Sequence, residues 1–198
     1  MHYLIVGLGN PGEEYENTRH NTGRAVLDAI HKKGDFPEWK KDKKHNALIS
    51  VGILSGKKLT LLKPETFMNK SGGSLKNLIT SKKKAETLVV IHDDLDLPLG
   101  TLKMAFNRGS GGHKGVESII RAVKTEAFIR LKVGISPANT KGRAKKPSGG
   151  KAVDKFILGK FKENEEKILS KISRRAVEVI KTLLTEGREK ATQICNQI

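Results

Sequence analysis

Cysteine is almost absent from this chain of 198 residues, which contains only Cys195. A single cysteine cannot form an intramolecular disulfide, so the sequence excludes a disulfide-stapled fold and suits a reducing compartment. No apolar run approaches the length needed to span a bilayer. Residues 1–6 lack the basic region and the small-residue cleavage site of a signal peptide. We therefore expect a cytoplasmic protein with no membrane partner.

Aromatic residues and negative charge are also scarce. Aromatics make up 5% of the chain, which argues against the base-stacking surface of a single-strand binder. The 21 acidic residues face 38 basic ones, for a net charge of +17, and such a field concentrates polyanions near the surface. The lysines and arginines cluster at 32–44, 82–84 and 141–151, although each block alone is equally typical of a solvated surface. Together they favour nucleic acid over a membrane, because no basic amphipathic anchor is evident.

Apolar runs alternate with amphipathic stretches along the chain. Strands are predicted at 3–7, 87–92, 101–106 and 128–135, with a hairpin formed by 46–53 and 58–63. Helices are predicted at 23–32, 73–79, 112–123 and 162–187, the last stopping at Gly187. The Gly-, Pro- and Lys-rich segment 136–150 is predicted to be a mobile loop. This order predicts one α/β domain over residues 1–198, with a mixed, mostly parallel sheet flanked by helices.

The segment Gly7-Leu8-Gly9-Asn10-Pro11-Gly12 follows the first strand and has the spelling of a dinucleotide-binding fingerprint. Three features oppose that interpretation. Glu13 and Glu14 place negative charge where a pyrophosphate would lie, the amphipathic helix begins only near Gly23, and no second strand ends in an acidic residue at the required distance. A glycine turn explains the glycines. It does not explain Asn10, which offers a donor and an acceptor at the carboxyl end of a strand, where α/β sheets bind ligands.

His20 and Asp93 are the candidates for acid–base chemistry. His20 lies in a polar segment just before a helix, a position in which a lone histidine is usually a surface residue. Asp93 lies in the acidic segment 92–100, where a hard-cation site would need more oxygen ligands and glycine turns, and where turn capping accounts for Asp94 or Asp96. The remaining interpretation is that Asp93 orients His20 and stabilises its cation. A base and its orienter without a side-chain nucleophile point to activated water.

Two further segments offer binding groups. Asn69, in the segment 63–72 after a strand, is a second amide that together with Asn10 can grip a peptide backbone and stabilise an oxyanion. In the same segment, core packing is expected for Phe67 or Met68. The segment 109–115 leads into a helix, so its backbone N–H groups and the helix dipole suit a phosphate. Its alternative is a flexible loop and a helix start.

In their order and spacing, these segments resemble the bacterial-type peptidyl-tRNA hydrolase family. The resemblance is weakest at 32–44 and after 136, and it rests on the segments 7–23, 64–72, 92–100, 109–120 and 128–134. It implies a single α/β domain with a twisted mixed sheet, a monomer without metal, cofactor or obligate protein partner. The implied activity is hydrolysis of the ester between a peptide and the 3′ ribose of tRNA, which recycles tRNA during translation.

The resemblance also implies residue roles by motif position. His20 would activate water, Asp93 would hold it, and Asn10 would contact the peptide. The other implied contacts to peptide or tRNA are Tyr15, Phe67, Asn69, Lys103, His113, Lys114 and Arg130.

The chain departs from the family pattern at two positions. Lys114 stands where the family commonly has asparagine, and Ala105 where it often has a basic residue. A lysine cannot accept a hydrogen bond, although its cation can meet the terminal phosphates of tRNA. Both departures concern substrate binding, and neither touches His20 or Asp93.

Two alternatives come from other classes of function. The first is a catalytically silent RNA-binding protein on the same fold. The joint presence of His20, Asp93, Asn10 and Asn69 argues against it, because a binder has no need of a base and its orienter. The second is a nicotinamide-dependent oxidoreductase, which the fingerprint spelling alone suggests.

Overall fold

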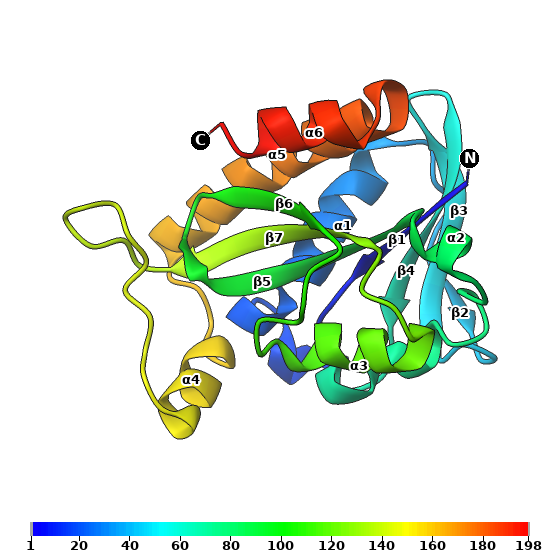
Figure 1. Ribbon diagram of the computed structural model, residues 1–198. Coiled ribbons are helices and arrows are strands. Elements are labelled where there is room, and N and C mark those ends of the chain that lie inside the picture. Colours follow the sequence, from blue (N-terminus) through cyan, green and yellow to red (C-terminus); the bar gives the residue numbers. More distant parts are fainter. Residues whose placement is uncertain (1, 198) are drawn as a thin grey trace.

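One seven-stranded sheet organises the computed structural model, which describes residues 2–197 (Figure 1). Its strand order is β2-β3-β4-β1-β5-β7-β6. The four central strands, β4, β1, β5 and β7, are parallel to one another, whereas β2, β3 and β6 join them through antiparallel pairing. The strands are β1 Tyr3–Gly7, β2 Lys40–Asp42, β3 Ala47–Leu54, β4 Lys57–Pro64, β5 Leu88–Pro98, β6 Leu102–Phe106 and β7 Ile129–Ser136. The predicted α/β class with a mixed sheet is confirmed, and the parallel pairing lies at its centre.

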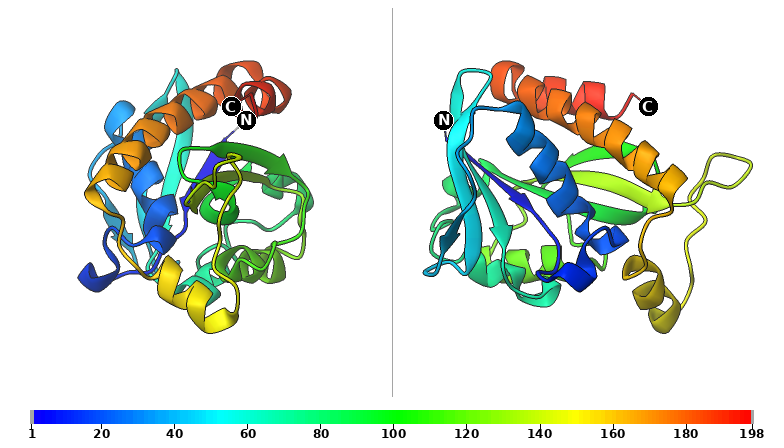
Figure 2. Two further views of the ribbon diagram at one scale, coloured as in Figure 1. Left: turned by 90° about the vertical axis from the view of Figure 1, so that its left-hand side faces the viewer. Right: turned by 180° about the vertical axis from the view of Figure 1, so that it is seen from behind.

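Helices cover both faces of the sheet (Figures 1 and 2). One face carries α1, α5 and α6, and the other carries α3 and the 3₁₀ helix η3. The helices are α1 Thr22–Lys33, α2 Lys82–Ala85, α3 Lys114–Val123, α4 Gly150–Ile157, α5 Glu163–Glu186 and α6 Arg188–Cys195, with 3₁₀ helices η1 Glu13–Tyr15, η2 Arg19–Asn21 and η3 Met68–Ser74. No helix within residues 2–197 is long and apolar enough to cross a membrane.

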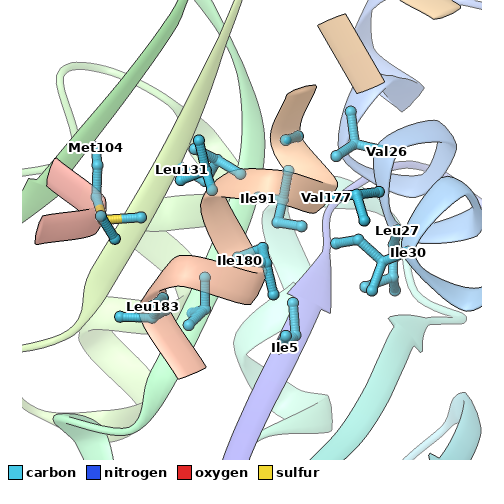
Figure 3. Close-up of a cluster of buried hydrophobic side chains, with 14 of the residues drawn as sticks. Ile5, Val26, Leu27, Ile30, Ile91, Met104, Leu131, Val177, Ile180 and Leu183 are labelled. Atoms are coloured by element: carbon cyan, nitrogen blue, oxygen red, sulfur yellow. The ribbon is translucent and has the colours of Figure 1, made fainter. Parts of the chain in front are cut away.

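The larger hydrophobic core lies between the sheet and the helices α1 and α5. Successive side chains of a strand point to opposite faces, so Ile5 of β1 packs toward α1 while its neighbours Leu4 and Val6 pack toward α3. Figure 3 shows Ile5 among side chains from β5, α1 and α5, including Leu27 and Ile180. Complete burial of each such side chain contributes about 1.5–3 kcal/mol, so this layer holds α1 and the segment before it on the sheet.

The helix predicted at residues 73–79 is wrong. The chain instead forms η3 from Met68 to Ser74, followed by turns. Here η3 lies against α3 so closely that a Cβ at Gly72 would come within 2.1 Å of the Ser118 carbonyl oxygen. The Gly72 amide donates to the Ser118 hydroxyl at 3.0 Å, so η3 is held against α3 just before the segment that was expected to be helical.

Several other elements differ from the sequence expectations. The short elements β2, α2, α4 and α6 were not predicted. Gly187 ends α5 as expected, but its φ of 90° turns the chain directly into α6. Residues 137–149 form no helix or regular strand, and α4 begins at Gly150, the last residue of the predicted loop. The strand predicted at 87–92 runs on to Pro98, so the acidic segment is part of β5 rather than a loop after it.

The extension of β5 creates an open edge beside the first strand. β1 pairs with β5 as far as Gly7 and Ile91, and there β1 ends. β5 continues with β7 as its neighbour, with Asp93 paired to Val133. The side of β5 that β1 leaves uncovered is where η2 lies, and this brings His20 to Asp93.

Replacing Gly72 by alanine tests the close packing of η3 on α3. A Cβ at Gly72 meets the Ser118 backbone, and Gly72→Ala is expected to lower the free energy of unfolding by about 1–3 kcal/mol through overpacking. The neighbouring Gly73 is the matched control, because a Cβ there meets nothing within 4 Å. Urea unfolding measures both, and equal midpoints for the two variants would contradict the packing described here.

Candidate active site

Arg19 fixes η2 in place. Its Nη2 contacts Glu165 Oε2 of α5 at 2.7 Å, and its Nη1 donates to the Ile135 carbonyl of β7 at 3.2 Å. The guanidinium also lies over the rings of Phe156 and Phe161, at 4.5 and 4.7 Å from their centres. A buried arginine with these contacts holds the next residue, His20, to the sheet. The sequence arguments missed Arg19 because its partners are remote along the chain.

The His20 ring is hydrogen-bonded to the carboxylate of Asp93. Nδ1 of His20 lies 3.1 Å from each of the two carboxylate oxygens, and both side chains are buried. Because a carboxylate only accepts, Nδ1 carries the proton, and in the neutral ring Nε2 is left with a free lone pair. Burial alone lowers the pKa of His20, but the charge and hydrogen bond of Asp93 outweigh it and hold this pKa above its ordinary value. The predicted base and orienter are thus brought together.

His113 is a second partner of the same carboxylate. Its Nε2 lies 3.0 Å from Asp93 Oδ1, while its Nδ1 accepts the backbone N–H groups of Gly115 and Val116 at the start of α3. An Nδ1 that accepts has no proton, so Nε2 is the donor to Asp93. Both ring nitrogens are therefore used within the protein. The role of His113 in substrate binding stays a prediction, and in the structure its ring links Asp93 to the start of α3.

Asp93 stays ionised in this environment. Burial by itself raises the pKa of its carboxyl, but His20 and His113, through their charges and hydrogen bonds, place that pKa well below its usual range. Below them, fully buried His92 donates from Nδ1 to the Asp93 carbonyl at 2.7 Å and meets the His113 ring edge-on at 4.7 Å. Burial lowers the pKa of His92 well below its ordinary value, so this ring is neutral. The site thus combines one carboxylate with three imidazole rings, of which His20 and His113 hydrogen-bond to the carboxylate and His92 lies behind them as a neutral ring.

The ligand atoms of His20, Asp93 and His113 lie within 4.8 Å of one another, which is close enough for a metal ion. Their hydrogen bonds do not fit one. A metal on Nε2 of His113 would displace its proton while Nδ1 still accepts the amides at the start of α3, which leaves an imidazolate. The Asp93 carboxylate instead accepts hydrogen bonds from His20 Nδ1 and His113 Nε2, so the three residues fit a hydrogen-bonded cluster rather than a metal site.

A cavity of about 160 Å³ opens beside this centre. Three lysine–carboxylate pairs surround it: Lys132 with Asp94 at 2.8 Å, Lys114 with Asp154 at 3.3 Å, and Lys146 with Asp96. Its apolar wall comes from Leu95, Val153 and Ile157. Each of these lysines is paired with a carboxylate, so an anionic group can bind by taking the place of that carboxylate on a lysine.

Asn10 lines a hollow together with Asn21 and Arg24. Its backbone is clamped by Asn21, which accepts from the Asn10 amide at 2.8 Å and donates to the Asn10 carbonyl at 2.9 Å. The Met68 amide donates to Asn10 Oδ1 at 2.8 Å, so the side-chain orientation is fixed and Nδ2 is left as a donor. Asn21 was not predicted from the sequence. It adjoins His20, so one short helix holds both the base and Asn10.

The contact between Asn10 and Met68 brings the predicted binding residues together. Phe67 and Asn69 flank Met68 and are exposed, and the Tyr15 ring meets the Phe67 ring edge-on at 6.3 Å. An aromatic side chain exposed at 56% beside two amides forms a surface for an apolar or peptide group.

Of the cations predicted to contact phosphate, Arg130 does not fit that interpretation. Its side chain is 1% exposed, and Nη1 donates to the Gly109 carbonyl. Arg130 thus supports the loop before α3 from within. The β7 cation that lines the cavity is instead Lys132, two residues further along the strand and paired directly with exposed Lys103 of β6. The sequence arguments did not identify Lys132. Arg130 and Lys132 lie on the same face of β7, and alternation along the strand does not show which of them a loop covers.

Replacing Asp93 by asparagine is expected to reverse the shift of the His20 pKa. With the carboxylate, this pKa lies above 6.5; without it, burial acts alone and the pKa should fall below 6.5. NMR titration of the His20 ring measures both values. Asp96→Asn, which removes an exposed carboxylate of the same strand, is the matched control. An unchanged His20 pKa in a folded Asp93→Asn protein would refute the assignment of the cause.

Comparison with known proteins is consistent along the whole chain. A family model described as "Peptidyl-tRNA hydrolase" matches residues 4–198. The peptidyl-tRNA hydrolase of Aquifex aeolicus is 41% identical, covering 98% of this chain and 96% of the relative, and that of Thermodesulfovibrio yellowstonii is 42% identical, with 98% and 99% covered. A crystal structure of the Acinetobacter baumannii peptidyl-tRNA hydrolase superimposes with a TM-score of 0.87 at 31% identity, over 98% and 94% of the two chains. With this match and the site described above, the chain belongs to the peptidyl-tRNA hydrolase family.

Proposed function

We propose that this protein hydrolyses the ester bond between peptide and tRNA in peptidyl-tRNA, which returns tRNA to translation. The observation that carries the proposal is the pair of 3.1 Å contacts between His20 Nδ1 and the Asp93 carboxylate, which leave Nε2 as a base beside a cavity. Family membership supplies the substrate, since the relatives are named as hydrolases of this ester.

In the proposed reaction, His20 Nε2 takes a proton from water as the water oxygen attacks the ester carbonyl carbon. The C–O bond to the 3′ ribose then breaks, and the protonated ring returns its proton to the leaving oxygen. Asp93 stabilises the imidazolium that exists between these steps. It also holds the His20 ring so that Nε2 is directed away from the carboxylate. A base works best when its pKa lies near the working pH, and the upward shift of the His20 pKa serves that purpose.

Asn10 and Asn69 are proposed to hold the peptide side of the substrate. Because Met68 and Asn21 fix Asn10, its Nδ2 donor is held in place before substrate arrives, and donors fixed in advance lose little freedom on binding. The Tyr15–Phe67 pair would receive an apolar part of the peptide or the tRNA end.

The tRNA side is proposed to meet the cations around the cavity. Lys132 and Lys103 face each other across β7 and β6, and Lys114 begins α3, where the helix dipole adds positive potential. Lys114 now pairs with Asp154 at an exposed site, a contact weak enough to be exchanged for a phosphate.

The remaining elements of the proposal are a monomer acting in the cytoplasm without metal, cofactor or obligate protein partner. A net charge of +17 opposes self-association. The hydrogen bonds of His20 and His113 to Asp93 already use the atoms that a metal would need.

Release of the amino acid from N-acetyl-aminoacyl-tRNA, beside the unacetylated form, tests the proposal. The wild type should release it from the acetylated substrate only. His20→Ala should lower the maximal rate by about 10²–10⁴-fold with little change in tRNA binding, because the general base is removed. The matched control is His45→Ala, a histidine of the turn before β3 that bonds Asp42.

Two outcomes would contradict the proposal. A folded wild type that binds tRNA but releases nothing would make the protein a silent binder. A His20→Ala variant that keeps its rate would show that another group activates water.

A further inference from the structure

A groove separate from the catalytic cavity lies at the end of the sheet where β1 and β5 begin, far from His20 and Asp93. It encloses about 600 Å³ and is lined by His2 and Leu4 at the start of β1 and by Thr87 just before β5. Asp93, by contrast, lies beyond the point where β1 ends. The groove shares no lining residue with the catalytic cavity, so an occupant would leave His20 accessible.

The floor of the groove continues into an uncovered apolar stripe on β3. Ile49 lines the groove, and alternation along the regular β3–β4 pairing places Val51 and Ile53 on the same face of the sheet. Val51 is 42% and Ile53 49% exposed, although both are large apolar side chains in a strand. The described helices α3 and η3 cover this face over β1 and β5, with core contacts that include Leu4 and Val90. Over β3, Val51 and Ile53 are left partly uncovered.

Lysines outnumber acidic residues beside the stripe, where Glu38 and Asp42 also border Ile49 and Val51. Lys58 is paired directly with Ile53, and Lys40 with Ile49, so both lie on the same face as the apolar residues. Lys83 and Lys84 line the groove from α2. None of these four lysines forms an ion pair within residues 2–197, whereas the lysines around the catalytic cavity are paired with carboxylates.

We propose that this surface binds an acidic amphipathic helix of a partner protein, with apolar side chains on Ile49, Val51 and Ile53 and carboxylates on the surrounding lysines. Apolar side chains at the centre of a positively charged rim are complementary to such a helix. The stripe from Ile49 to Ile53 is about 13 Å long, and helix positions i, i+4 and i+8 span about 12 Å, so three anchors can follow it.

Other occupants fit less well. A strand cannot extend the sheet here, because β2 pairs with β3 as far as Ile49 and Asp35 bonds Ile53 in both directions. RNA would use the lysines but gain nothing from the apolar stripe, and no Phe, Tyr or Trp lines the groove for stacking. A second copy would bring another net charge of +17 to a basic surface.

The test uses a fluorescein-labelled synthetic helix of about 18 residues, or five turns, with leucine at i, i+4, i+8 and i+11 and glutamate at the exposed positions. Fluorescence anisotropy should show binding to the full-length protein, and a scrambled peptide of the same composition should bind more weakly. Val51→Ser/Ile53→Ser should weaken binding about tenfold through lost apolar contact, while the control Ile168→Ser, exposed on α5, should not. Lys83→Gln/Lys84→Gln should also weaken it more than Lys171→Gln/Lys190→Gln, which removes the same charge elsewhere.

Each remaining outcome would overturn the proposal. The first is that the wild type does not bind the helix. The second is that the scrambled peptide binds equally well, and the third is that the groove variants and their controls have equal effects. Either of the last two would mean that binding depends only on non-specific charge. Thermal unfolding of each variant checks that it is folded. In a final competition experiment, a single-stranded RNA is added to the helix bound to the wild type and to Val51→Ser/Ile53→Ser. Equally efficient displacement from both proteins would assign the surface to nucleic acid instead.

Discussion

The Asp93 carboxylate, buried and accepting hydrogen bonds from two imidazole rings, is the interaction on which the rest of the site depends. It exists because β1 ends at Gly7 while β5 continues, which leaves Asp93 uncovered on the side where η2 approaches. His20 gains a protonated Nδ1 and a raised pKa from it. His113 fixes the carboxylate to the start of α3, so the position of the base is set by the packing of helices on both faces of the sheet.

Local patterns in the sequence predicted the central strands, the long helices α1 and α5, and the meeting of His20 with Asp93. They did so because apolar periodicity and polar residues at strand ends are local signals. The helix predicted at 73–79 was wrong, and the segment instead continues from η3, which packs Gly72 on Ser118 in a contact that depends on the tertiary fold. The same limit explains why Arg19 and Asn21 were missed, since both act through remote partners. Arg130 and Lys132 differ only in which one a loop covers, and no local pattern records that.

The large positive charge is divided into two environments. Around the catalytic cavity the lysines pair with carboxylates, and a phosphate can compete with a carboxylate for a lysine. Along β3 and α2 the lysines are unpaired within residues 2–197 and border apolar side chains. One sheet thus carries a surface of lysine–carboxylate pairs beside the catalytic cavity and an apolar surface bordered by unpaired lysines over β3 and α2. Because the two cavities share no lining residue, a polyanion and an acidic helix can be bound without competing for the same residues.

The most direct test of the claim that Asp93 makes His20 a base is the pH dependence of kcat/KM for N-acetyl-aminoacyl-tRNA, in the wild type and in Asp93→Asn. The account predicts that wild-type activity falls as the pH drops through a pKa above 6.5, because His20 becomes protonated there. In Asp93→Asn the rate should be lower throughout, and its acid limb should move to a pH below 6.5. An acid limb at the same pH in both proteins would contradict the account, because the group that titrates would then not be held by Asp93.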